Sequence, residues 1–187
     1  MAPGGGVRTV RPLITAEQYD SWSEEVCADI EVSDGLLVRR PSRSHMHNRL
    51  ARFLANALET AAGPEWYADG NFDVRLQDVP LTNRCPDVVL YRASTIDVMP
   101  ARPEHILLLV EVVSPGPETT DRITKPAQYA KAGIQYYWRV EQFSNADPKV
   151  FTYELDPKTA TYRASEAFTG LVKATAPFKV TADLTGL

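Results

Sequence analysis

Cysteine is scarce in this chain of 187 residues, which contains two, Cys27 and Cys85. They form no CxxC pair, so a disulfide-stapled secreted scaffold is disfavoured and a reducing compartment is the simpler expectation. A zinc site made of these two cysteines with His45 and His47 is rejected, because no pair of them has the spacing of zinc ligands.

Long apolar runs are also lacking. The longest covers residues 106–110, whereas a membrane-spanning helix needs about 20 apolar residues. Residues 1–12 are rich in glycine and carry no apolar stretch of the kind found in signal peptides. We therefore expect a cytoplasmic protein with no membrane partner.

An excess of positive charge is absent as well. The chain has 20 Lys and Arg against 24 Asp and Glu, a net charge of −4. A strongly basic chain would indicate nucleic acid directly, so such a function must here depend on a local patch. One basic block, free of acidic residues, spans residues 35–58. Its arginines, which either contact phosphates or form an ordinary solvated face, are Arg39, Arg40, Arg43, Arg49 and Arg52.

The composition is that of a globular protein, with 44% hydrophobic and 24% charged residues. Residues 1–12 are predicted to be a flexible tail and residues 13–187 a single domain. Capping and periodicity predict helices over 15–24, 44–63 and 121–132, with a hairpin over 30–38. Strands are predicted at 71–76, 87–91, 106–113 and 134–143, followed by a hairpin at 149–164. Residues 77–86 are expected to form a polar connection. These elements predict an α/β domain.

Glu111 is the strongest single clue to function. It lies in the apolar segment ILLLVEVV, where a carboxylate is costly unless it is paired, protonated or bound to a metal. Asp87 follows Pro86 and opens another predicted strand. Two carboxylates on adjacent strands would supply the hard oxygen ligands that Mg²⁺ prefers, and a cation would offset their repulsion. The ordinary alternatives are a glutamate bonded to an arginine and an aspartate that caps a turn.

Lys125, Gln128 and Tyr129 share one face of the predicted helix that follows Glu111. Lys125 either reaches over the cleft to a scissile group or forms a surface ion pair with Asp121 or Glu118. Glu31 is a candidate third acid, although its spacing favours exposure. His47 shares a helical line with Leu50, which favours a core histidine over a site residue.

Taken in order, these residues resemble the Uma-type endonucleases of the PD-(D/E)XK restriction-endonuclease-like superfamily. The resemblance is carried by Glu31, Asp34-Gly35, Pro41, His47, Pro86-Asp87, Glu111-Val112-Val113-Ser114-Pro115, Asp121, Lys125, Tyr129, Gly133-Ile134 and Tyr137-Trp138.

The resemblance implies a central mixed sheet flanked by helices and Mg²⁺-dependent cleavage of DNA, with Mn²⁺ as a possible substitute. It implies that Asp87 and Glu111 hold the metal, which polarises the phosphate and activates a water. The superfamily's lysine would fall at Val113, which is apolar, and Lys125 matches the lysine that the Uma-type pattern places on the next helix. Pro126 is a further departure from the Uma-type pattern, in which the helix usually has an ordinary residue at this position. A homodimer is expected by analogy with nucleases that cut two strands.

Two alternatives stay open. One is a nuclease fold that has lost activity and binds nucleic acid or protein. The other is a metal-dependent hydrolase of a small phosphorylated molecule.

Overall fold

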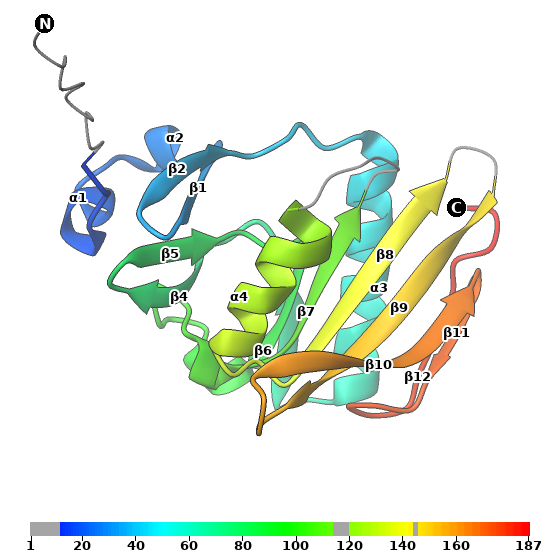
Figure 1. Cartoon of the computed structure of the whole chain (residues 1–187). Coiled ribbons are helices and arrows are strands. Elements are labelled where there is room, and N and C mark those ends of the chain that lie inside the picture. Colours follow the sequence, from blue (N-terminus) through cyan, green and yellow to red (C-terminus); the bar gives the residue numbers. More distant parts are fainter. Residues whose placement is uncertain (1–11, 114–119, 144–145) are drawn as a thin grey trace, which may run out of the picture.

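The larger of the two main sheets has six strands in the order β10-β9-β8-β7-β6-β3 (Figure 1). The computed structural model describes residues 12–113, 120–143 and 146–187, so the predicted tail falls almost wholly outside the described residues. β7 and β8 are parallel and the other neighbours antiparallel, which makes this a mixed sheet, as the resemblance implies. Its strands are β3 (Trp66–Asp69), β6 (Val88–Arg92), β7 (Ile106–Val113), β8 (Tyr136–Phe143), β9 (Ala146–Asp156) and β10 (Thr161–Thr169).

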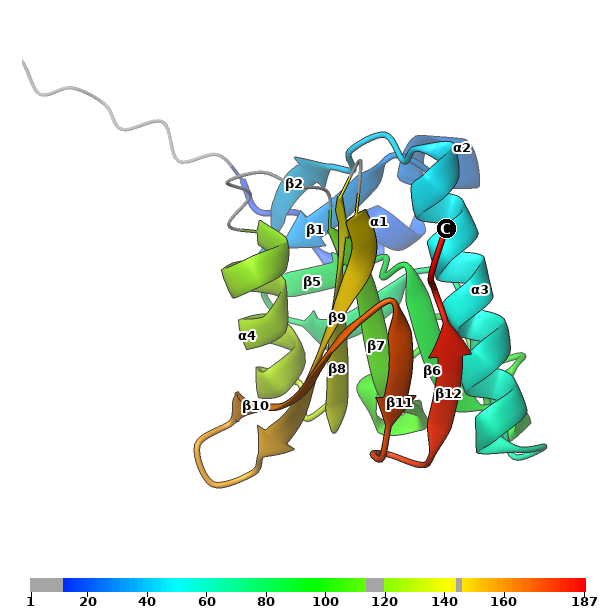
Figure 2. The same cartoon turned by 90° about the vertical axis from the view of Figure 1, so that its right-hand side faces the viewer.

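Helices cover both faces of this sheet. α3 (His45–Ala62) lies on one face beside the β11 (Leu171–Ala174) and β12 (Val180–Asp183) hairpin, and α4 (Lys125–Lys131) lies on the other (Figure 2). The Ser44 hydroxyl caps α3 by accepting a hydrogen bond from the His47 N–H at 3.1 Å. The helix buries its predicted leucine stripe against β3, β6 and β7, and each buried leucine stabilises the fold by about 1.5–3 kcal/mol.

A second, antiparallel sheet has the order β2-β1-β5-β4. The predicted hairpin forms β1 (Ile30–Ser33) and β2 (Leu36–Arg39), and β4 (Val74–Asp78) lies at the other edge. The predicted polar connection over residues 77–86 is wrong, because its middle is β5 (Leu81–Arg84), whose four side chains are all buried. Three of them are polar and have hydrogen-bond partners in other segments of the chain, so hydropathy gave no sign of a strand.

The predicted helix at residues 121–132 has two parts. Thr120–Thr124 form a π-helical turn, and the regular α4 begins at Lys125, the residue before Pro126. Proline is tolerated at the second helical position because the N–H groups there have no partner within the helix. The predicted helix at residues 15–24 is shorter, α1 (Ala16–Asp20), and is followed by α2 (Glu24–Cys27). Strands β3, β11 and β12 were not predicted.

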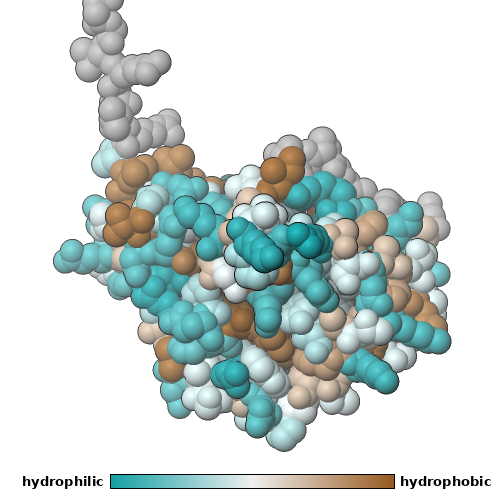
Figure 3. All heavy atoms as spheres, turned by 60° about the horizontal axis from the view of Figure 1, so that its bottom comes forward, coloured by the Kyte–Doolittle hydropathy of each residue, from teal (hydrophilic) through white to brown (hydrophobic). Residues whose placement is uncertain are grey.

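The face at the start of β7 is mostly hydrophilic, with separate apolar areas (Figure 3). At this end of the sheet an apolar pocket of about 180 Å³ is lined by residues that include Phe72, Tyr91 and Met99. None of the helices in the described ranges has the length and apolar character needed to cross a membrane.

Candidate active site

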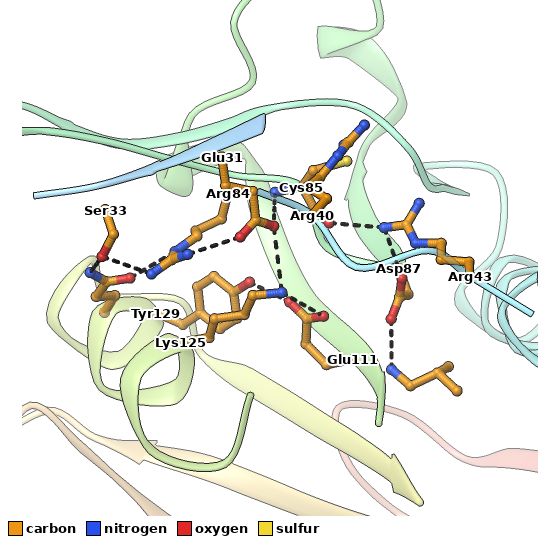
Figure 4. A network of polar contacts seen from close by, with 12 residues as sticks. Glu31, Ser33, Arg40, Arg43, Arg84, Cys85, Asp87, Glu111, Lys125 and Tyr129 are labelled. Atoms are coloured by element: carbon orange, nitrogen blue, oxygen red, sulfur yellow. Dashed lines mark hydrogen bonds and ion pairs between the residues drawn. The ribbon is translucent and has the colours of Figure 1, made fainter. Parts of the chain in front are cut away.

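Glu111 occupies the α4 side of β7, close to the end of the strand. Alternation along β7 puts it on the same face as Leu109, which packs in the α4-side core, and its side chain is 3% exposed. The Tyr129 hydroxyl donates a hydrogen bond to Glu111 Oε1 at 2.5 Å, and Lys125 Nζ lies 3.2 Å from Oε2 (Figure 4). The buried carboxylate is therefore paired with a cation and a hydroxyl, both supplied by α4.

Lys125 is the first residue of α4 and is buried, with its amine between two acids. Its Nζ atom is 3.2 Å from Glu111 Oε2 and 3.4 Å from Glu31 Oε1. A lysine at a helix N-terminus opposes the helix dipole, so the two carboxylates supply the compensation. The alternative surface ion pair of Lys125 with Asp121 or Glu118 falls outside the described part of the structure, which includes neither Glu118 nor the Asp121 side chain.

Glu31 is buried, with 4% of its surface exposed. The surface position that its spacing favoured is therefore wrong. Glu31 lies on β1, and the unpredicted strand β5 runs beside β1 and supplies its partners. Glu31 Oε2 is 2.8 Å from Arg84 Nη1, and Oε1 accepts a hydrogen bond from the Cys85 N–H at 3.1 Å. Glu31, the candidate third acid, is therefore connected to Glu111 through Lys125.

Gln128, the remaining candidate on α4, connects the helix to the second sheet. Its Oε1 accepts from Arg84 Nε at 2.9 Å, and its Nε2 donates to Ser33 Oγ at 3.0 Å. Nε2 also donates to Asp34 Oδ2 at 3.1 Å, so these hydrogen bonds of Gln128 go to the second sheet and its hairpin turn and not to Asp87 or Glu111. Gln128 is therefore a structural link between α4 and β1.

Asp87 lies beside Glu111 in the sheet. Val88 pairs with Val110, so Asp87 stands opposite Glu111 at the same end of two neighbouring strands. Its Oδ2 accepts a hydrogen bond from the Val112 N–H at 2.8 Å, and Oδ1 lies 2.9 Å from Arg43 Nη2. Both acids therefore lie where β6 and β7 meet, but each has its own polar partners.

His47 is a neighbour of Asp87 and not a histidine enclosed in the apolar core. Its Nε2 atom is 2.8 Å from Asp87 Oδ1, and its side chain is 12% exposed. Burial raises the pKa of Asp87, but the interactions with His47, Arg43 and the Val112 N–H outweigh it and hold that pKa below its ordinary value. Asp87 is consequently ionised at neutral pH.

The basic block does not act as one surface. Arg43 faces Asp87 and also donates hydrogen bonds to Asn71 and to the Cys85 carbonyl, whereas Arg40 donates to the Ala28 carbonyl. Arg39, Arg49 and Arg52 are exposed. Of the five arginines, Arg43 is thus the one that meets a carboxylate of the candidate site.

A polar groove of about 540 Å³ begins at Asp87 and Arg43 and runs along α3. Asn48, Arg52 and Asn56, spaced four residues apart, form its helical wall. Its lining also includes Asp69 and Gly70, and a Cβ atom on Gly70 would lie 2.2 Å from the Asp87 carbonyl oxygen. Glycine is therefore required where the groove wall meets the Asp87 backbone.

Carboxylates suit a hard divalent ion, and the register of β6 and β7 puts the backbones of Asp87 and Glu111 level with each other. The Asp87 carboxylate meets Arg43 and His47 on the α3 side, and the Glu111 carboxylate meets α4. Over the described ranges, no cluster of three or more His, Cys, Asp and Glu side chains is arranged to hold a metal. Cys27 and Cys85 are both free thiols. A metal held here would therefore use the two carboxylates with oxygen ligands from water or substrate.

Comparison with known proteins gives one family and one fold. The family model of Uma2, described as putative restriction endonuclease, matches residues 16–184. The structure is similar to the crystal structure of a putative nuclease belonging to DUF820 from Anabaena variabilis, with 16% identity and a TM-score of 0.64 over 87% of this chain and 90% of that one. No curated protein matches. The likeness shows the restriction-endonuclease-like fold, and the family match supports a nuclease function.

Proposed function

This chain belongs to the Uma2 family of putative restriction endonucleases, and we propose that it is a Mg²⁺-dependent endonuclease that hydrolyses DNA phosphodiesters. The observation that carries the proposal is the pair of buried acids, Asp87 and Glu111, at level backbone positions of neighbouring strands, with the Lys125 amine beside Glu111. A divalent ion would be held by Asp87 and Glu111, and Mn²⁺ would substitute for Mg²⁺. The chemistry that such an ion supplies when bound is polarisation of a phosphoryl oxygen and a lowered pKa for a nearby water.

The chain's own residues have separate tasks in this proposal. The Lys125 ammonium stabilises the negative charge that develops on the phosphoryl oxygens, the task that Val113 cannot perform. The Tyr129 hydroxyl orients Glu111. Burial, followed by the charges of Glu111 and Glu31, raises the pKa of Tyr129 well above its ordinary value, so this hydroxyl keeps its proton.

The substrate strand would reach Asp87 through the groove along α3. Its exposed Arg52 can contact a phosphate, and the amides of Asn48 and Asn56 can bond to sugar or base edges. The groove is polar, so it suits a nucleic-acid strand better than an apolar ligand. A cytoplasmic location and a homodimer stay predictions.

Nicking of supercoiled plasmid DNA tests this function. The wild-type protein should nick the plasmid with Mg²⁺ or Mn²⁺ and not with EDTA. D87N and E111Q should lose the activity, whereas D97N, at an exposed aspartate outside the groove lining, should keep it.

Two other outcomes would contradict the proposal. DNA binding without cleavage under any of these metals would identify an inactive binding module. Metal-dependent hydrolysis of a small phosphate diester, with no cleavage of the plasmid, would identify the small-substrate enzyme.

A further inference from the structure

Arg84 is a buried arginine that the proposed mechanism leaves without a task. It lies at the end of β5, is 1% exposed, and is followed after two residues by Asp87. Its guanidinium makes three contacts of 2.8–2.9 Å, and the atoms that accept them are Glu31 Oε2, Gln128 Oε1 and Ser33 Oγ. These contacts join β1, β5 and α4, which come from three separate parts of the chain.

The contacts continue from Arg84 to the proposed catalytic lysine. Arg84 pairs with Glu31, Glu31 lies 3.4 Å from Lys125, and Lys125 lies 3.2 Å from Glu111 (Figure 4). Charges alternate along this buried series, with two cations and two carboxylates. Within the described ranges, the cations that meet Glu31 are Arg84 and Lys125, and the Arg84 contact is the shorter.

We propose that Arg84 is a positioning residue for DNA cleavage, which neutralises Glu31 and so leaves the Lys125 amine directed at Glu111. Without Arg84, Glu31 would draw Lys125 toward itself, because a buried carboxylate needs a counter-charge. The bond from Arg84 to Gln128 acts in the same direction, since it fixes the helix that carries Lys125. This inference rests on the proposed nuclease function for its kinetic part only.

The position of Arg84 also relates it to Asp87. The short segment from β5 into β6 places Arg84 on the α4 side of the site and Asp87 directly before the start of β6. The Cys85 N–H in this segment donates a hydrogen bond to Glu31. Residues 84–87 therefore contact Glu31, which lies beside Lys125, and also include Asp87. A substitution of Arg84 should therefore affect cleavage through its contacts with Glu31 and α4 and not through direct contact with the substrate.

The test uses the full chain and three variants. R84M should lower kcat for plasmid nicking by about 10- to 100-fold, the usual effect of losing a residue that supports a site, with KM little changed. Its Mn²⁺ affinity by calorimetry should be equal or higher, because the buried cluster loses one positive charge. R84M/E31Q should be no less active than E31Q, since the charge that Arg84 offsets is gone.

R75M is the matched control. Arg75 is also buried, lies on β4 of the same sheet, and pairs with Asp20 and Asn83, away from the site. We expect R75M to lose stability while its cleavage per folded molecule stays at the wild-type level.

A crystal structure of R84M tests the inference without any need for cleavage. Lys125 Nζ should lie closer than 3.4 Å to Glu31 and farther than 3.2 Å from Glu111. If Lys125 keeps its wild-type contacts in R84M, the inference is overturned, even where cleavage falls. If the lysine moves as expected but no variant or wild type cleaves DNA, the positioning role stands and the nuclease function fails. If R84M does not fold, R84M/E31Q is crystallised, and Lys125 away from Glu111 in that variant overturns the inference.

Discussion

Asp87→Asn should cost the fold measurable stability, because the buried Asp87 carboxylate is paired with the Arg43 guanidinium. Arg43 and the Val112 N–H hold the carboxylate at 2.9 and 2.8 Å, and His47 lies at 2.8 Å. Removing one partner of a buried charge pair costs about 3–5 kcal/mol. Arg43 keeps its bonds to Asn71 and the Cys85 carbonyl, and its side chain is 22% exposed, so the lower value applies.

A loss of about 3 kcal/mol lowers Tm by roughly 6–12 °C in a domain of this size. The pH dependence has a definite sign. Asp87 has a folded pKa below its ordinary value, so its stabilisation is complete above the unfolded pKa of about 3.9 and is lost as pH falls through the folded pKa. Wild type and D87N should therefore differ by a constant amount from pH 7 to pH 5 and converge in acid.

Thermal melts of both proteins across this pH range, followed by circular dichroism, make the comparison. The control is D97N, which removes the charge of an exposed aspartate and should change stability by no more than about 0.5 kcal/mol. Equal melting of D87N and wild type at pH 7 would refute the reasoning. A difference that persists unchanged in acid would refute it equally, because the effect would not come from the carboxylate.

Two further predictions concern cleavage and DNA binding. Lys125→Met should abolish Mg²⁺-dependent nicking while Lys125→Arg keeps part of it, and full activity in the methionine variant would remove Lys125 from the mechanism. Arg52→Gln should weaken binding of a fluorescent oligonucleotide in anisotropy titrations and reduce the slope of log Kd against log salt by about one, because Arg52 lines the groove. Arg49→Gln, at an exposed arginine of the same helix outside the groove lining, is the matched control, and equal effects of the two variants would contradict the assignment of the groove.

The periodic elements of the fold were predictable from sequence. The leucine stripe of α3, the apolar run of β7 and the turn at Asp34-Gly35 each carry a strong local signal, and all three elements are present. β5 carries none, because its buried Thr82, Asn83 and Arg84 read as solvent-exposed when their partners are unknown. Strand pairing between distant segments supplies those partners, and a single sequence does not reveal it.

The candidate site divides in the same way. The anomaly of Glu111 in an apolar strand identified it directly, and Lys125 followed from the family pattern. Glu31 and His47 were assigned from local spacing to the surface and to the core, and the structure corrects both, because Arg84 and Asp87 reach them from other elements. Arg84 itself was missed, although a charged residue so close to Pro86-Asp87 was the one available signal.

The central claim is that Asp87 and Glu111 together hold a divalent metal, and an anomalous difference map of crystals soaked in Mn²⁺ tests it most directly. We expect one peak within coordination distance, about 2.0–2.3 Å, of a carboxylate oxygen of each acid, and we expect this peak to be lost in E111Q crystals. A map with no peak between the two carboxylates, or with a peak that survives in E111Q at full height, would contradict it.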